Sequence, residues 1–182
     1  MGTINDEAIK TLDELIELDA VAIEAYEIVI EKIGDDDLEL LEDLESFKAD
    51  HEQHIRDLTR VVEALGGEAE QPTRDLRGMF LEGMTMLRAA TNTVGALEAM
   101  RLDERVTSRV YDKAAEVEVP PLAAVVIMQN LDDERRHLAV IQRHIERLVG
   151  EDAATTRDDL AYDEVEPLPR DAPLEVGDRP AL

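Results

Sequence analysis

Apolar residues recur every three or four positions along most of the chain, and this spacing predicts amphipathic helices rather than strands. The pattern is interrupted at Gly34, at Gly66–Gly67, at Pro120–Pro121 and at Gly150. Glycine is common just past a helix end, and proline is tolerated in a first helical turn. The pattern therefore predicts four long helices, from about Asn5 to Ile33, from 35–37 to 66, from about Thr93 to near Val117, and from 120 to near Gly150.

A long connector, residues 67–92, joins the second predicted helix to the third, and Pro72–Thr73 open a short amphipathic stretch within it. The turns at Gly34 and at 117–120 are short, so each pair of helices should be antiparallel. The connector is long enough to travel the length of a bundle. We therefore expect an all-α, ferritin-like four-helix bundle over residues 1–150, with one long crossover between its second and third helices.

The last segment, residues 151–182, differs from the rest. It contains Pro167, Pro169, Pro173, Pro180 and many acidic residues, and it shows no periodicity. We expect this tail to be disordered or to lie over a neighbouring molecule.

Four polar residues stand in the apolar stripes near the middle of the predicted helices: Asp19, His51, Glu104 and Glu134. The midpoints of similar-length helices lie at one level of a bundle, so these side chains should meet in one buried layer. Burying isolated charges is costly, and a metal ion is the simplest compensation.

The two halves of the chain also carry nearly the same polar pattern. Asp19 is followed by Tyr26 and then by His51 and His54, and Glu104 is followed by Tyr111 and then by Glu134 and His137. A carboxylate from one helix and an acid-x-x-His pair from the next, supplied twice, build a carboxylate-bridged dinuclear centre. The predicted metal ligands are Asp19, His51, His54, Glu104, Glu134 and His137. Tyr26 and Tyr111 can orient the carboxylates.

Each of these residues also has an ordinary interpretation. His54 and His137 can be solvated, Glu104 and Glu134 can belong to exposed charged runs, and both tyrosines can be packing residues. Among competing polar residues, Asp50 is expected to face away from the stripe and His144 to lie at the bundle edge. Glu24 and Glu98 are weaker candidates, each displaced from its stripe.

Composition narrows the chemistry. The chain has no cysteine, so a metal must take oxygen and nitrogen ligands. The net charge of -25 argues against nucleic-acid binding and against anionic membranes. No apolar run approaches a membrane span, and the N-terminus lacks the apolar region of a signal peptide, so we expect a cytoplasmic protein. The acid excess and scarce lysine are typical of a halophile proteome or of an ordinary acidic protein.

Several stretches resemble the ferritin-like superfamily. Leu18–Tyr26 is similar to the first ligand helix of bacterioferritins, and Glu104–Ala114 resembles the third helix of rubrerythrins. Glu134–His137 matches the superfamily's Glu-x-x-His, whereas His51–His54 matches only its histidine. The run from about residue 5 to 149 resembles small bacterial ferritin-like proteins with a domain of unknown function. Two departures stand out: Asp19 replaces a glutamate, and His51 replaces a bridging carboxylate.

The resemblance implies a metal-binding oxidase or ferroxidase acting on Fe(II) with O2 or peroxide. It would hold two iron ions, with Mn or Zn as alternatives. Glu134 would bridge them, with Asp19, His51 and His54 on one ion and Glu104 and His137 on the other. Glu134, Tyr26 and Tyr111 are the candidate catalytic residues, and a homo-oligomer is expected.

A second function stays open: a non-enzymatic helical stress or interaction protein whose metal site is degenerate or structural, which the His51 departure favours. In the tail, Pro173–Asp178 resembles the targeting peptides of shell-compartment cargo.

Overall fold

The computed structural model describes residues 4–34, 37–68 and 77–162. In this part of the chain there are five helices and no strand. They are α1 (Ile4–Ile33), α2 (Leu38–Ala64), α3 (Arg77–Ala89), α4 (Thr93–Ala115) and α5 (Pro121–Tyr162). The chain divides into two units, Met1–Val149 and Gly150–Leu182. The first unit is the helical bundle.

The helix ends follow local backbone chemistry. Gly34 and Gly66 have φ angles of 57° and 89°, the left-handed conformation that glycine adopts easily, and they terminate α1 and α2. Asp37 and Asn92 cap the N-termini of α2 and α4 by accepting hydrogen bonds from backbone N–H groups at 3.2 and 2.8 Å. Pro121 occupies the first position of α5, where a missing N–H costs nothing.

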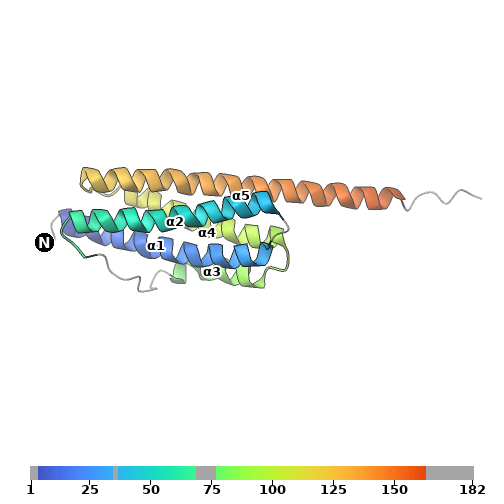
Figure 1. The fold of residues 1–182 in the computed structure, drawn as a ribbon, viewed down its shortest axis with the longest axis horizontal. Coiled ribbons are helices and arrows are strands. Elements are labelled where there is room, and N and C mark those ends of the chain that lie inside the picture. Colours follow the sequence, from blue (N-terminus) through green and yellow to red (C-terminus); the bar gives the residue numbers. More distant parts are fainter. Residues whose placement is uncertain (1–3, 35–36, 69–76, 163–182) are drawn as a thin grey trace, which may run out of the picture. The chain divides into compact units, whose positions relative to one another are not determined.

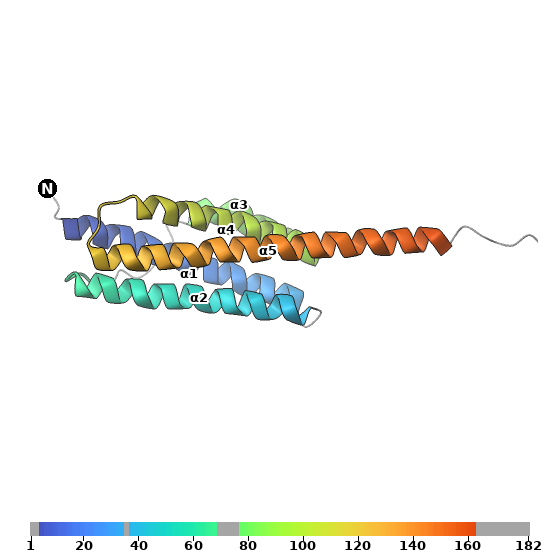
Figure 2. The ribbon, with the colours of Figure 1, turned by 90° about the horizontal axis from the view of Figure 1, so that it is seen from above.

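The bundle has the predicted crossover. Figures 1 and 2 show α2 returning beside α1, and α4 then running in the same direction as α2. The short stretch that was expected inside the connector is α3, which packs against α4 and α1. The first part of α5 runs back antiparallel to α4 (Figure 2). The prediction of an all-α four-helix bundle with one long crossover is confirmed, with α4 and α5 as its third and fourth helices.

A continuous apolar core runs along the bundle. Its large, fully buried members come from every helix and include Leu12, Leu44, Leu87, Leu97 and Leu131. Burying such a side chain stabilises the fold by about 1.5–3 kcal/mol. Midway along the bundle this core contains buried polar residues, and that layer is the candidate site. Within the described ranges, no helix is both long enough and apolar enough to cross a membrane.

The end of the last helix differs from the prediction. α5 continues through Gly150 to Tyr162 and does not stop near Gly150. A single exposed glycine costs a helix only about 1 kcal/mol, and helix-forming residues such as Glu151 and Ala153 follow it. The other residues of the predicted tail, 163–182, including Pro173–Asp178, lie outside the described residues.

Candidate metal centre

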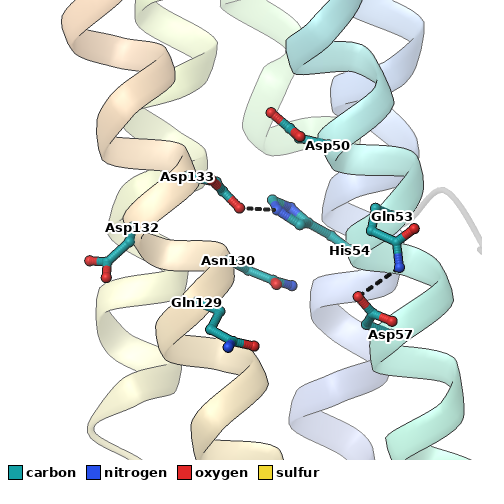
Figure 3. Close-up of a pocket in the computed structure, with 8 residues that line it drawn as sticks. All are labelled: Asp50, Gln53, His54, Asp57, Gln129, Asn130, Asp132 and Asp133. Atoms are coloured by element: carbon teal, nitrogen blue, oxygen red, sulfur yellow. Dashed lines mark hydrogen bonds and ion pairs between the residues drawn. The ribbon is translucent and has the colours of Figure 1, made fainter.

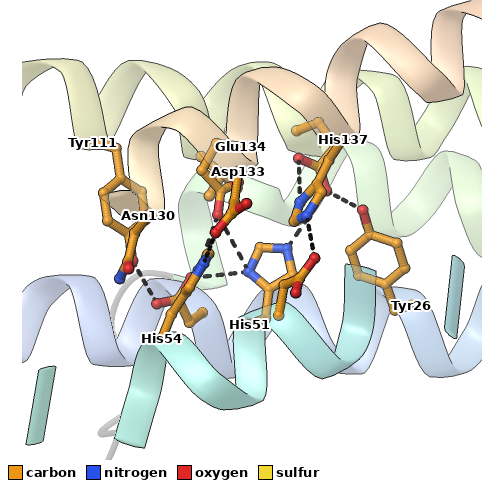
Figure 4. A network of polar contacts seen from close by, with 12 residues as sticks. Tyr26, His51, His54, Tyr111, Asn130, Asp133, Glu134 and His137 are labelled. Atoms are coloured by element: carbon orange, nitrogen blue, oxygen red, sulfur yellow. Dashed lines mark hydrogen bonds and ion pairs between the residues drawn. The ribbon is translucent and has the colours of Figure 1, made fainter. Parts of the chain in front are cut away.

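The six predicted ligands meet in one layer of the bundle, and Figure 4 labels four of them, His51, His54, Glu134 and His137. Asp19 comes from α1, His51 and His54 from α2, Glu104 from α4, and Glu134 and His137 from α5. None of the six side chains is more than 3% exposed. The helical period therefore brings together every residue that was singled out as a ligand.

These residues form two groups that each could hold one metal ion. The first is Asp19, His51, His54 and Glu134, and the second is His51, Glu104, Glu134 and His137. In each group the potential ligand atoms lie within 4.8 Å of one another. Glu134 belongs to both groups, as its expected bridging role requires. His51 also belongs to both, although it was expected in the first group alone.

His51 lies between the two groups and presents one ring nitrogen to each. Its Nδ1 is 2.9 Å from Oδ1 of Asp19 and 3.5 Å from Oε1 of Glu134. Its Nε2 is 3.7 Å from Oε1 of Glu104. The ring thus contacts carboxylates from three different helices.

The other two histidines turn only one nitrogen toward the centre. Nδ1 of His54 lies 3.4 Å from Oε1 of Glu134, while its Nε2 faces Oδ2 of Asp133 at 3.4 Å. Nδ1 of His137 faces the centre, while its Nε2 is 3.1 Å from Oδ2 of Asp50. A carboxylate that accepts a hydrogen bond from the outer nitrogen of a histidine holds the ring in one orientation, with its inner nitrogen available to a metal ion.

Sequence analysis missed both outer carboxylates. Asp50 was expected to face away from the stripe, which is wrong because its side chain reaches His137 across the gap between α2 and α5. Asp133 was not considered. The available signal was their position, since each directly precedes a predicted ligand, His51 or Glu134.

The two tyrosines connect the halves of the site. Tyr26 donates a hydrogen bond to Oε1 of Glu104 at 2.5 Å, and Tyr111 donates one to Oδ2 of Asp19 at 2.7 Å. Asn130 in turn donates to the Tyr111 hydroxyl at 3.2 Å. Burial, together with the adjacent carboxylates, raises the pKa of both tyrosines well above 10, so both remain donors at neutral pH. Each tyrosine thereby orients a carboxylate of the other half.

The donor atoms that face the centre suit a metal ion. Several are fully buried and have no hydrogen-bond partner among the residues that the structure describes: His51 Nε2, His54 Nδ1, His137 Nδ1, Glu104 Oε2 and both carboxylate oxygens of Glu134. Nearly all buried polar atoms in proteins are hydrogen-bonded, and leaving one unpaired costs about 1–3 kcal/mol. A cation between these atoms would use the lone pairs that hydrogen bonds leave free.

The charges within the centre oppose one another. Burial acts to lower the pKa of His51, but Glu134, Asp19 and Glu104 outweigh burial and raise that pKa well above its usual value. For His54, contacts with Asp19 and Glu134 likewise overcome burial and raise the pKa to about 10. Protons on these rings balance the carboxylates, so a metal cation must displace them. Metal affinity should therefore fall at low pH.

The carboxylates respond unequally to burial. Burial, helped by repulsion from Glu104 and Asp19, raises the pKa of Glu134 to about 8 despite the neighbouring His51. Burial also acts to raise the pKa of Asp19 and of Glu104, but their contacts with histidines prevail and hold both values below the usual range. Burial lowers the pKa of His137, which leaves its ring neutral and able to donate a lone pair.

An acidic cavity of about 410 Å³ lies beside His54 between α2 and α5 (Figure 3). Its lining includes four carboxylates, those of Asp50, Asp57, Asp132 and Asp133. His54 forms part of the cavity wall and of the centre at once. The cavity therefore adjoins the centre at His54.

Comparison with known proteins identifies the family. A family model described as a domain of unknown function, DUF2383, matches residues 7–117. The chain belongs to the DUF2383 family. The matched segment contains most of α1 and all of α2, α3 and α4, with Asp19, His51, His54 and Glu104, and it ends before α5. The comparison with curated proteins found no match.

A solved structure places this DUF2383 protein among known folds. The chain is similar to a dodecameric thioferritin, the bacterioferritin-related protein from Bacteroides fragilis. The TM-score is 0.66 and the identity 13%, over 82% of this chain and 90% of the other. The fold is therefore a ferritin-like helical bundle. The likeness is one of fold, and the site rests on the residues described above.

Other polar residues of this DUF2383 protein lie outside the two groups. Glu24 is half-buried, and Glu98 pairs with Arg101 near the surface. His144, expected at the bundle edge, is instead 5% exposed and bonded to Asp43. His144 is buried because it lies on the same face of α5 as Ile141 and Ile145, which pack in the core.

Proposed function

We propose that this protein binds two divalent metal ions in the bundle core and acts as a di-iron oxidase or ferroxidase. The observation that carries the proposal is the pair of four-residue groups that share Glu134 and His51. The unpaired donor atoms on these residues support it independently. Carboxylate and imidazole ligands suit Fe(II), and Mn(II) or Zn(II) are the alternatives.

The chain's own residues would perform distinct tasks. Glu134 would bind both ions, with Asp19, His51 and His54 completing one position and Glu104 and His137 the other. Tyr26 and Tyr111 would hold the carboxylates in place, and Asp133 and Asp50 would hold the outer nitrogens of the histidines. When bound, two Fe(II) ions would supply one electron each to O2, which takes up two protons and leaves as H2O2.

The surroundings of the centre fit this role. Phe47 stacks on the His137 ring with centroids 4.4 Å apart and covers the centre on that side. The acidic cavity beside His54 would attract cations and let them approach. Because the similar thioferritin is a dodecamer, we include a homo-oligomer in the proposal. A cytoplasmic location completes it.

The alternative is a non-enzymatic protein with a structural or degenerate site. The observation that favours it is His51 itself, because it stands where the superfamily has a bridging carboxylate. In that case the protein would bind metal without turning over O2.

The test begins with metal analysis of protein purified without added metal. An oxygen-consumption assay with Fe(II) follows. We expect two ions per chain and O2 uptake that depends on the chain. The double variant Glu134→Ala/His137→Ala should lose both. His144→Gln is the matched control, because it changes a buried histidine of α5 outside the centre.

The outcomes separate the two functions. Metal binding without oxidation would support the structural alternative. Unchanged metal content in the double variant would mean that the site lies elsewhere.

A further inference from the structure

We propose that His51 is a bridging ligand that binds one cation through Nδ1 and the other through Nε2, as an imidazolate. The inference rests on the proposed function, because it requires two cations in the centre. This bridge differs from one made by carboxylates alone. It gives His51, the residue that departs from the superfamily pattern, a direct role in joining the two metal positions.

Geometry gives the first argument. Each ring nitrogen of His51 faces a different carboxylate set, with Nδ1 at 2.9 Å from Asp19 and Nε2 at 3.7 Å from Glu104. His54 and His137 instead commit their outer nitrogens to Asp133 and Asp50. Among the three histidines of the centre, His51 is the one whose two nitrogens both point inward.

Confinement gives the second argument. His51 is fully buried, and it belongs to both groups. Three rings surround it, those of Tyr26, His54 and His137, with centroids 5.4, 5.5 and 5.2 Å from its own. The ring therefore has little freedom to turn one nitrogen away from its group.

Charge gives the third argument. The centre contains three carboxylates, Asp19, Glu104 and Glu134, whereas two divalent cations carry a charge of four. A buried site with net charge is costly, so a fourth negative charge is favoured. Loss of both ring N–H protons from His51 to the solvent turns the imidazolium into an imidazolate and supplies that charge, and no electron moves. Cations reverse the local pKa balance, because each positive charge on a ring nitrogen favours deprotonation.

The bridge has a measurable consequence. Metal–nitrogen bonds are about 2.0–2.1 Å for Zn(II). One imidazole ring between two such bonds keeps the ions about 6 Å apart, by addition of the ring width to the two bonds. Two-metal sites joined by short bridges have separations of about 3.5–4 Å. The distance between the ions therefore distinguishes the two kinds of bridge.

The experiment uses the full chain loaded with Zn(II), which is redox-inert. Anomalous diffraction at the zinc edge gives the separation of the ions, and titration calorimetry gives the two binding steps. The variants are His51→Gln and His51→Glu, with His144→Gln as a buried-histidine control. Circular dichroism of each metal-free variant checks that it folds.

We expect ions about 6 Å apart with the His51 ring between them. His51→Gln should weaken both binding steps, each by more than about 10-fold, because one residue serves both ions. His51→Glu should bring the ions to about 3.5–4 Å. His144→Gln should change neither step.

Other results would overturn the inference. Two ions at the shorter separation in the native chain, with His51 on one of them, would contradict the bridge and leave the proposed function intact. A single bound ion, or loss of only one binding step in His51→Gln, would also contradict the bridge. No binding in any form of the protein would overturn the proposed function as well. If His51→Gln does not fold, the separation measured in the native chain and in His51→Glu still decides.

Discussion

Asp103 is a buried carboxylate of α4 that sequence analysis did not single out. It is 3% exposed, and neither of its oxygens has a hydrogen-bond partner among the described residues. Burial, with a smaller effect from Glu104, raises its pKa from 3.8 to about 7. Between these two values the unfolded chain has lost the proton and the folded protein keeps it. The free energy of unfolding therefore falls as the pH rises from about 4 to about 7.

Asp103→Asn should remove this pH dependence, because the amide stays neutral at every pH. We expect the variant to be more stable than the native chain by about 1–3 kcal/mol at pH 8 and nearly equal to it at pH 4. Urea unfolding in metal-free buffer at both pH values measures the difference. An equal effect at pH 4 and pH 8 would contradict the ionisation argument.

Asp50 positions the ring of His137 and should control metal affinity without binding metal itself. Asp50→Asn should weaken metal binding by about 10- to 100-fold, as is typical when a partner of a ligand histidine is lost. Asp57→Asn is the matched control, because it removes an acid from the same helix and cavity that has no bond to a ligand. Calorimetry that finds equal losses in both variants would show that only the charge of the cavity matters.

At the scale of elements, α3 packs closely against α4 at Gly83. A Cβ at Gly83 would lie 1.8 Å from Oδ1 of Asp103 and 2.5 Å from its Cγ. The whole carboxyl group stands in the way, on a short side chain between two packed helices. The contact between the two helices therefore depends on a glycine at this position.

Gly83→Ala should destabilise the bundle by about 1–3 kcal/mol, despite the better helix propensity of alanine. The same change should cost much less in an Asp103→Ala background, because the obstructing group is gone. Gly150→Ala is the control, since no atom lies within 4 Å of a Cβ at that helical position, and it should not destabilise. Thermal unfolding of the native chain, Gly83→Ala, Asp103→Ala and the double variant completes the cycle. Equal costs with and without Asp103 would contradict the steric argument.

At the scale of the whole molecule, charge dominates. Asp and Glu number 44 against 19 Lys and Arg, so the folded chain repels itself. Salt screens this repulsion, with a Debye length that falls from about 10 Å at 0.1 M to about 3 Å at 1 M. We expect the melting temperature of the metal-free protein to rise by several degrees over this range. A flat response would remove both the self-repulsion argument and the halophile hypothesis.

The sequence by itself determined the helices, the crossover and the meeting of the six polar residues. The helical period predicts which side of a helix a residue occupies, and the midpoints of helices of similar length lie at one level along the bundle axis. These two regularities are enough to place Asp19 and Glu134 in one buried layer. The prediction that the last helix ends at Gly150 was wrong, because one glycine costs too little free energy to end a helix when the residues that follow it are helix formers.

Only the tertiary structure decided which atom faces which. The period fixes the direction of a Cβ, whereas helix tilt and side-chain rotamers determine where a ring nitrogen or a carboxylate oxygen points. For that reason His51 was assigned to one metal position, whereas it lies between both. For the same reason Asp50 was expected to face away from the apolar stripe, whereas its carboxylate reaches His137. The burial of Asp103 depends on α3, which packs against α4. The periodicity within α4 carries no information about where α3 packs.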